Sequence, residues 1–152
     1  MEARIPNLPN LVGDGYKAMF ALEAFLHSSD LPTTILELVK LRVSQINGCG
    51  YCVDMHAHDL KKAGETDERL WSVAAWRESP YYTDEERAAL NLAEAATRIA
   101  DNPHGVPDDV WDEAADHFDE KTMGALIMAI TAINAWNRIN VTNRQPAALR
   151  RA

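Results

Sequence analysis

The chain carries both of its cysteines in the stretch Gly48-Cys49-Gly50-Tyr51-Cys52-Val53-Asp54-Met55-His56. A helical pattern ends at Gly48 and a second one begins near Gly50, so the stretch is predicted to join two helices. Residues four apart share a helix face, which makes Cys52 and His56 predicted neighbours. A helix N-terminus stabilises a thiolate through its N–H groups and dipole. A C-x-x-C pair placed there can alternate between dithiol and disulfide, and His56 can exchange a proton with the thiolate.

Two plainer interpretations compete with a redox pair. Both cysteines could simply be packed in the core, where free cysteine is common. A zinc site could use Cys49, Cys52, His56 and His58, since structural zinc usually takes four protein ligands. His56 and His58 are only two residues apart on a predicted helix and point to different faces, and the chain has no second C-x-x-C pair. These points favour the redox pair over zinc.

The helix predicted before this stretch, from Pro32 to about Gln45, is apolar on most sides, which indicates a buried helix. Glu37 lies within it, and a buried carboxylate must be paired, protonated or functional. An ion pair with Lys40 or Lys61, or a place on a solvated edge, is the plainer interpretation of this residue.

The levels of the two helices can be compared if they fold back on each other. Glu37 would lie roughly 13 Å before a helix end near Ile46, and His56 roughly 9 Å after a helix start near Gly50. The two side chains are therefore expected at nearly the same level. The sequence predicts that Glu37, Cys49, Cys52 and His56 converge on one site.

The remaining sequence predicts an all-α protein with a single domain over residues 1–152 and about seven helices. Helical periodicity adds five helices to the two already described, at about 15–27, 66–76, 83–100, 107–118 and 120–140, and no strand-like alternation occurs. Residues 1–12 contain two prolines and are expected to form an extended arm, whereas residues 143–152 are expected to be a loose tail. The helix at 120–140 has few polar faces, so it is either the central helix or partly an intersubunit surface.

The net charge and the composition of the chain limit which partners and which cellular location are expected. The net charge is −8, with acidic residues concentrated between Asp84 and Glu120, and such a surface repels nucleic acid and anionic membranes. No apolar run approaches the ~20 residues of a membrane span.

The start of the chain lacks the pattern of a signal peptide, and a close cysteine pair without a secretion signal suggests a reducing compartment, so we expect a cytoplasmic protein. Neither a metal nor another cofactor is expected.

The spacing of Glu37, Cys49, Cys52 and His56 resembles the signature of the AhpD-like alkylhydroperoxidase family, within the carboxymuconolactone decarboxylase superfamily. The flanking segments Leu36-Glu37-Leu38-Val39 and Ala135-Trp136-Asn137-Arg138-Ile139-Asn140 are also similar to that family. The resemblance covers roughly residues 32–141.

This resemblance implies an all-α fold assembled as trimers or hexamers, and reduction of a peroxide at the expense of a thiol reductant such as a dithiol or a thioredoxin-like protein. Cys52 would attack the peroxide, Cys49 would resolve the sulfenic acid as a disulfide, and His56 and Glu37 would relay protons. Tyr51 stands where the best-studied members have a histidine, and a phenol cannot replace an imidazole as a relay at neutral pH.

Three other functions remain as alternatives. The first is a protein disulfide oxidoreductase and the second is a redox-sensing module, both without peroxide specificity. The third is an activity of the superfamily's decarboxylase branch, which is not expected to need the cysteine pair.

Overall fold

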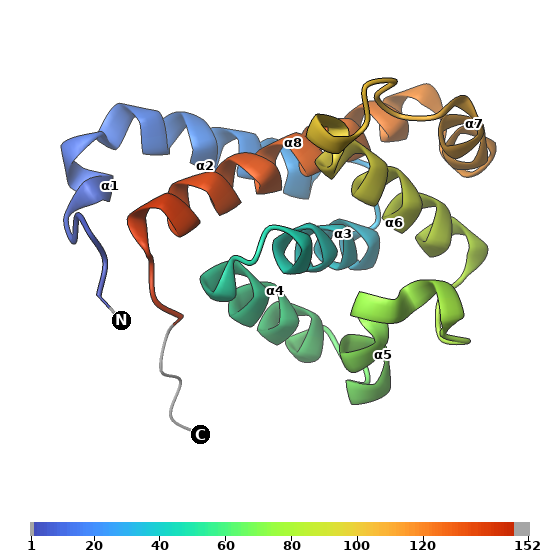
Figure 1. The fold of residues 1–152 in the computed structure, drawn as a ribbon, viewed down its shortest axis with the longest axis horizontal. Helices are drawn as coiled ribbons and strands as arrows, with labels where there is room; N and C mark the ends of the chain where they lie inside the picture. The colour runs from blue at the N-terminus through green and yellow to red at the C-terminus, as the bar shows by residue number, and fades with distance from the viewer. Residues whose placement is uncertain (1, 148–152) are drawn as a thin grey trace.

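A computed structural model describes residues 2–147, and over that range the protein is all-α, as predicted. Eight α-helices and two short 3₁₀ helices form one domain in these residues (Figure 1). They are α1 (Leu8–Leu11), α2 (Gly13–Ser28), α3 (Thr33–Ile46), α4 (Gly50–Lys62), α5 (Asp67–Ser72), η1 (Val73–Glu78), α6 (Asp84–Thr97), η2 (Ile99–Asp101), α7 (Asp108–His117) and α8 (Glu120–Asn143). The expected helix over 66–76 is divided into α5 and η1, with non-helical backbone angles at Ala75.

Helix α3 is the centre of the domain and packs against α4, α6 and α8 (Figure 1). Every residue from 35 to 41 is buried, which agrees with the nearly all-apolar pattern of this helix. One face of α3, with Leu36 and Val39, belongs to the core cluster shared with α6 and α8. Another face, with Leu38 and Leu41, belongs to a second cluster shared with α4, η1 and α6. Each fully buried leucine contributes about 1.5–3 kcal/mol, so the position of α3 is well determined.

The turn between α3 and α4 depends on Gly48, which has a φ of 68°. A residue with a side chain rarely adopts this left-handed conformation, whereas glycine does so at no steric cost. The turn is short, and Cys49 directly after Gly48 is already the N-cap of α4. The two helices therefore pack side by side, and α4 begins with the cysteine pair.

Local capping sets the start of other helices. Thr83 and Glu86 form a reciprocal capping box at α6. The Asp119 side chain accepts a hydrogen bond of 2.8 Å from the backbone N–H of Thr122 and caps α8. These caps satisfy N–H groups that have no partner within their helix.

The N-terminal segment differs from the expected extended arm, because residues 8–11 form α1 and the residues before it are bound to the end of α8. The backbone N–H of Arg4 donates to the carbonyl of Asn143 (2.8 Å), and that of Ile5 donates to the Asn143 side-chain oxygen (2.8 Å). Pro9 lies in the first turn of α1, where its missing N–H costs nothing. Asn143, expected at the start of a loose tail, is buried as the last residue of α8. Residues 148–152 of that tail lie outside the described range.

Glu94 of α6 connects three parts of the fold. One carboxylate oxygen accepts hydrogen bonds from Arg42 of α3 (2.6 Å) and Trp76 of η1 (3.0 Å). The other oxygen accepts from Arg77 (3.0 Å) and Arg98 (3.2 Å). Burial would raise the pKa of Glu94, but the Trp76 and Arg42 hydrogen bonds and the arginine charges outweigh it, so the pKa lies below its ordinary value of 4.5.

Removing this carboxylate is expected to weaken the fold in a pH-dependent way. Because the folded-state pKa is lowered, the stabilisation is present above about pH 4.5 and is lost as the pH falls through the folded value. Glu94→Gln should therefore lower the free energy of unfolding by about 3 kcal/mol at pH 7 and by much less at pH 3. Urea denaturation at both pH values measures this. Glu78→Gln, which changes an exposed carboxylate at the end of η1, is the control, and equal losses in the two variants would contradict the prediction.

Several large apolar side chains are exposed on the single chain. On α2 these include Phe20, with 61% of its surface exposed, and on α8 they include Ile127, at 42%. None of the helices formed by the described residues is long and apolar enough to cross a bilayer. Exposed apolar surface of this kind is characteristic of subunit contacts.

The chain is accordingly expected to form a homo-oligomer, and the family resemblance implies that it is a trimer or a hexamer. Light scattering at micromolar concentration should give three or six times the chain mass of 16.9 kDa. Phe20→Glu and Ile127→Glu each place a charge among exposed apolar residues, the first on α2 and the second on α8. The variant whose charge lies in the subunit interface should dissociate the oligomer. A wild-type mass of 16.9 kDa would show that the exposed apolar residues do not form an interface.

Candidate active site

The cysteine pair occupies the start of α4 and is joined as a disulfide in the structure. Cys49 is the N-cap, and its sulfur accepts a hydrogen bond from the backbone N–H of Cys52 (3.4 Å). The two Cα atoms are 5.3 Å apart, within the usual range for a disulfide. Only 1% of the surface of each cysteine is exposed. A pair in this position can change between dithiol and disulfide with little movement of the backbone.

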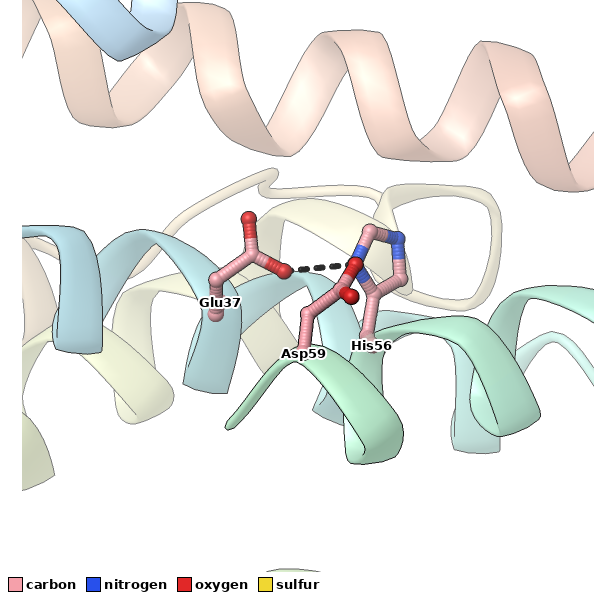
Figure 2. Close-up of side chains that lie close together, drawn as sticks. All are labelled: Glu37, His56 and Asp59. Carbon is pink, nitrogen blue, oxygen red and sulfur yellow. Dashed lines mark hydrogen bonds and ion pairs between the residues drawn. The ribbon is translucent and has the colours of Figure 1, made fainter. Parts of the chain in front are cut away.

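His56 and Glu37 meet beside the pair, although they lie on different helices. The Nδ1 atom of His56 lies 2.7 Å from Oε2 of Glu37, and Figure 2 shows the two side chains facing each other from α4 and α3. A carboxylate accepts, so Nδ1 carries the hydrogen and Nε2 has the free lone pair when the ring is neutral. Nε2 is buried and has no hydrogen-bond partner among the described residues. The imidazole of His56 is thus held by Glu37 in an orientation that leaves Nε2 available to accept a proton.

Glu37 is held as a carboxylate by its neighbours. Burial would raise its pKa, but the hydrogen bond and charge of His56 and the charge of Lys40 outweigh burial, so the pKa of Glu37 lies below its ordinary value of 4.5. Lys40 Nζ is 3.5 Å from Oε1 of Glu37. The structure therefore contains the ion pair of Glu37 with Lys40 that the plainer interpretation of this residue expected, whereas Lys61 pairs with Asp67 at 2.5 Å.

A cavity of about 580 Å³ opens over these groups. Cys52, His56 and Glu37 are among the described residues that line it, whereas Cys49 is not. The wall opposite α4 comes from α2 and α8 and is largely aromatic, with Tyr16 and Trp136 at a ring separation of 5.6 Å. Within the pair, Cys52 is therefore the cysteine that faces the cavity.

Sequence reasoning missed three polar residues of this cavity. Asn140 of α8 donates through Nδ2 to the sulfur of Cys52 (3.4 Å), a contact that would also stabilise a thiolate. Glu23 of α2 and Trp136 of α8 hydrogen-bond to each other (2.9 Å), and Glu23 also binds Lys40. Asn140 and Trp136 stood in a quoted flanking segment without an assigned role, and the charge of Glu23 among the apolar residues of its helix was an available signal.

Glu37, His56 and Asp59 have potential ligand atoms within 4.8 Å of one another (Figure 2). The ammonium of Lys40 lies against Glu37 and already supplies a positive charge there, which disfavours a cation at this position. We therefore do not assign these residues as metal ligands. The four-ligand zinc interpretation also fails, because the two cysteines are bonded to each other and His58 is exposed on another face of α4 from buried His56.

Known proteins resemble this chain in both sequence and fold. The carboxymuconolactone decarboxylase family model matches residues 13–95. The chain is 41% identical over 135 residues to YdfG, an uncharacterised protein of Bacillus subtilis, covering 89% of this chain and 90% of that protein. It is 34% identical over 119 residues to the uncharacterised YnjA of Escherichia coli, covering 78% of this chain and 64% of that protein.

Among solved structures, an Agrobacterium tumefaciens protein of unknown function, provisionally assigned as the antioxidant defence protein AhpD, superposes with a TM-score of 0.92. It is 38% identical, and the match covers 98% of this chain and all of that one. The core of an alkylhydroperoxidase AhpD-like, peroxidase-related protein from Ralstonia eutropha shares the fold at a TM-score of 0.79 and 19% identity. The protein belongs to the carboxymuconolactone decarboxylase family and has the AhpD-like fold.

Proposed function

We propose that this protein is a thiol-dependent peroxidase in which Cys52 is the nucleophile and Cys49 the resolving cysteine. The carrying observation is that Cys52, rather than Cys49, faces the cavity shared with His56. In the reduced protein, the Cys52 thiolate would attack a peroxide oxygen, the O–O bond would break, and an alcohol or water would leave. The product on Cys52 is a sulfenic acid.

The second half of the cycle uses the neighbouring thiol. Cys49 would attack the sulfenic sulfur and release water, which forms the Cys49–Cys52 bond present in the structure. A dithiol reductant would then return both sulfurs to thiols by exchange. Reducing conditions such as those of the cytoplasm would keep that reductant available.

His56 would serve as the proton carrier in this scheme. Its Nε2 lone pair can accept the Cys52 proton, and the resulting imidazolium would be stabilised by Glu37 at 2.7 Å. The leaving oxygen needs a proton, and the same imidazolium can supply it. This role does not require a histidine at position 51, which is occupied here by a partly buried tyrosine.

A protein disulfide oxidoreductase or redox-sensing module uses the same cysteine chemistry. Both sulfurs are almost fully buried, so a folded partner protein would have to reach Cys52 through the cavity. That constraint favours a small substrate. A decarboxylase of the wider superfamily has no evident use for the pair.

The assignment of the two cysteines can be tested by trapping the intermediate. Reduced Cys49→Ser should accumulate a dimedone-reactive sulfenic acid on Cys52 after stoichiometric peroxide, because no resolving thiol remains. Reduced Cys52→Ser should stay largely unmodified. Mass spectrometry locates the adduct. Modification confined to Cys49 would reverse the roles, and absence of peroxide turnover by wild type, together with exchange with a protein disulfide, would support the oxidoreductase instead.

The proton relay can be tested through the rate of Cys52 oxidation. His56→Ala and Glu37→Gln should each slow the reaction with peroxide by at least about tenfold, since losing a proton-transfer group costs ~10²–10⁴. Their effects should be less than additive, because they act as one unit. Stopped-flow measurement across pH 5–9 gives the rates. His58→Ala changes an exposed histidine on the same helix and should react like wild type. Wild-type rates in both relay variants would leave Glu37 as a structural ion-pair partner.

A further inference from the structure

Among the described residues, Lys40 is the largest whose side chain is fully buried, with 2% of its surface exposed. An ammonium in such a position is costly unless it is paired. Its Nζ donates to Oε2 of Glu23 at 2.7 Å and lies 3.5 Å from Oε1 of Glu37. Lys40 therefore sits between two carboxylates, one on α2 and one on its own helix.

These contacts form a chain across four helices. Trp136 of α8 donates to Oε1 of Glu23 at 2.9 Å, and Glu23 accepts from Lys40 through its other oxygen. Lys40 contacts Oε1 of Glu37, and Oε2 of Glu37 meets Nδ1 of His56. Each of the two carboxylates therefore binds one neighbour through one oxygen and the next neighbour through the other. The orientation of His56 is connected in this way to side chains on α2 and α8.

We propose that Lys40 and Glu23 are positioning residues of the active site, which together set the charge next to the Glu37–His56 pair and so the pH range in which Cys52 is reactive. The proposal rests on the proposed thiol chemistry. Together with the hydrogen bond to His56, the Lys40 ammonium at 3.5 Å helps to keep Glu37 ionised and oriented toward His56. Glu23 neutralises part of the Lys40 charge and holds the ammonium with the help of Trp136.

Other titratable groups around the cavity do not replace this arrangement. Besides the residues named, Tyr16 and His27 on α2 and Tyr51 and Asp59 on α4 line it. The side chains from α8, among them Trp136 and Asn140, do not titrate. His27 is exposed. The carboxylate of Asp59 lies within 4.8 Å of the Glu37–His56 pair and 3.7 Å from the exposed Lys62, so it adds a negative charge that is the same in every variant below. Among the described residues that line the cavity, Lys40 provides the one ammonium.

The charges determine the direction of each effect. Removing a positive charge beside a cluster of ionisable groups favours protonation of the cluster, and removing a negative charge disfavours it. Lys40→Met should therefore move the acid limb of Cys52 reactivity to higher pH, whereas Glu23→Gln should move it to lower pH. These directions hold whether the proton resides on Cys52, His56 or Glu37, because coupled groups titrate together.

The experiment measures alkylation of Cys52 by iodoacetamide in the reduced protein from pH 4 to 9, with mass spectrometry identifying the site. Lys40→Met should raise the pH of half-maximal rate by about one unit, which is about a tenfold loss of rate on the acid limb. Glu23→Gln, which keeps an acceptor for Trp136, should lower it. Lys40→Arg should restore the wild-type midpoint. The double variant Lys40→Met/Glu23→Gln, which removes the two charges together, should lie close to wild type.

Midpoints that shift in opposite directions in Lys40→Met and Glu23→Gln would show that the two residues act through their charges. Loss of a purely structural ion pair would lower the rate or the stability without moving the two midpoints apart. Unchanged midpoints, or shifts in the same direction, would overturn the proposal. If Lys40→Met does not fold, Glu23→Gln alone decides, since a midpoint that stays or rises contradicts it. Lys121→Met removes an exposed ammonium at the start of α8 and is the control. Alkylation needs no peroxide, so wild type that fails to consume peroxide would reject the peroxidase and leave this inference standing.

Discussion

The burial of opposite charges on one helix is the constraint on which the rest of the structure depends. Glu37 and Lys40 lie within a run of α3 that is otherwise apolar and completely buried. Such charges are stable only when partners from neighbouring helices compensate them. Glu23 of α2 and His56 of α4 provide that compensation. The positions of α2 and α4 against α3 are therefore determined by charge as well as by packing. A core held by apolar contacts alone would tolerate small shifts of α2 and α4. The ion pairs of Lys40 with Glu23 and of Glu37 with His56 tolerate smaller shifts, because both depend on short distances between particular atoms.

The same constraint strengthens the influence that the buried groups of the site have on one another. The dielectric response around buried charges is low, so each hydrogen bond has a larger effect on its neighbours than it would in water. The turn at Gly48 brings the start of α4, whose N–H groups would stabilise a thiolate, to the end of α3. The proposed chemistry and the stability of the fold therefore depend on the same contacts.

Much of this arrangement could be predicted from local patterns. Helical periodicity and residue spacing predicted α3, α4 and the shared level of Glu37 and His56, because helix rise converts sequence distance into ångströms. Contacts between distant segments could not be found in this way. Nothing in the spacing of Glu23, Lys40 and Trp136 fixes how α2 and α8 are rotated about their axes, and the sulfur contact of Asn140 depends on the same rotation. The hydrogen bonds of Arg4 and Ile5 to Asn143 join residues 138 or more apart, and they attach the expected arm to the end of α8.

That N-terminal closure has a practical consequence for engineering. Pro9 of α1 and Gln145 just after α8 both line the cavity, so segments from opposite ends of the described chain form part of its rim. A domain fused through a short linker near either segment would be held beside the opening at high effective concentration. A small dithiol carried by such a domain could reach the Cys49–Cys52 disulfide through the cavity without first diffusing to the protein.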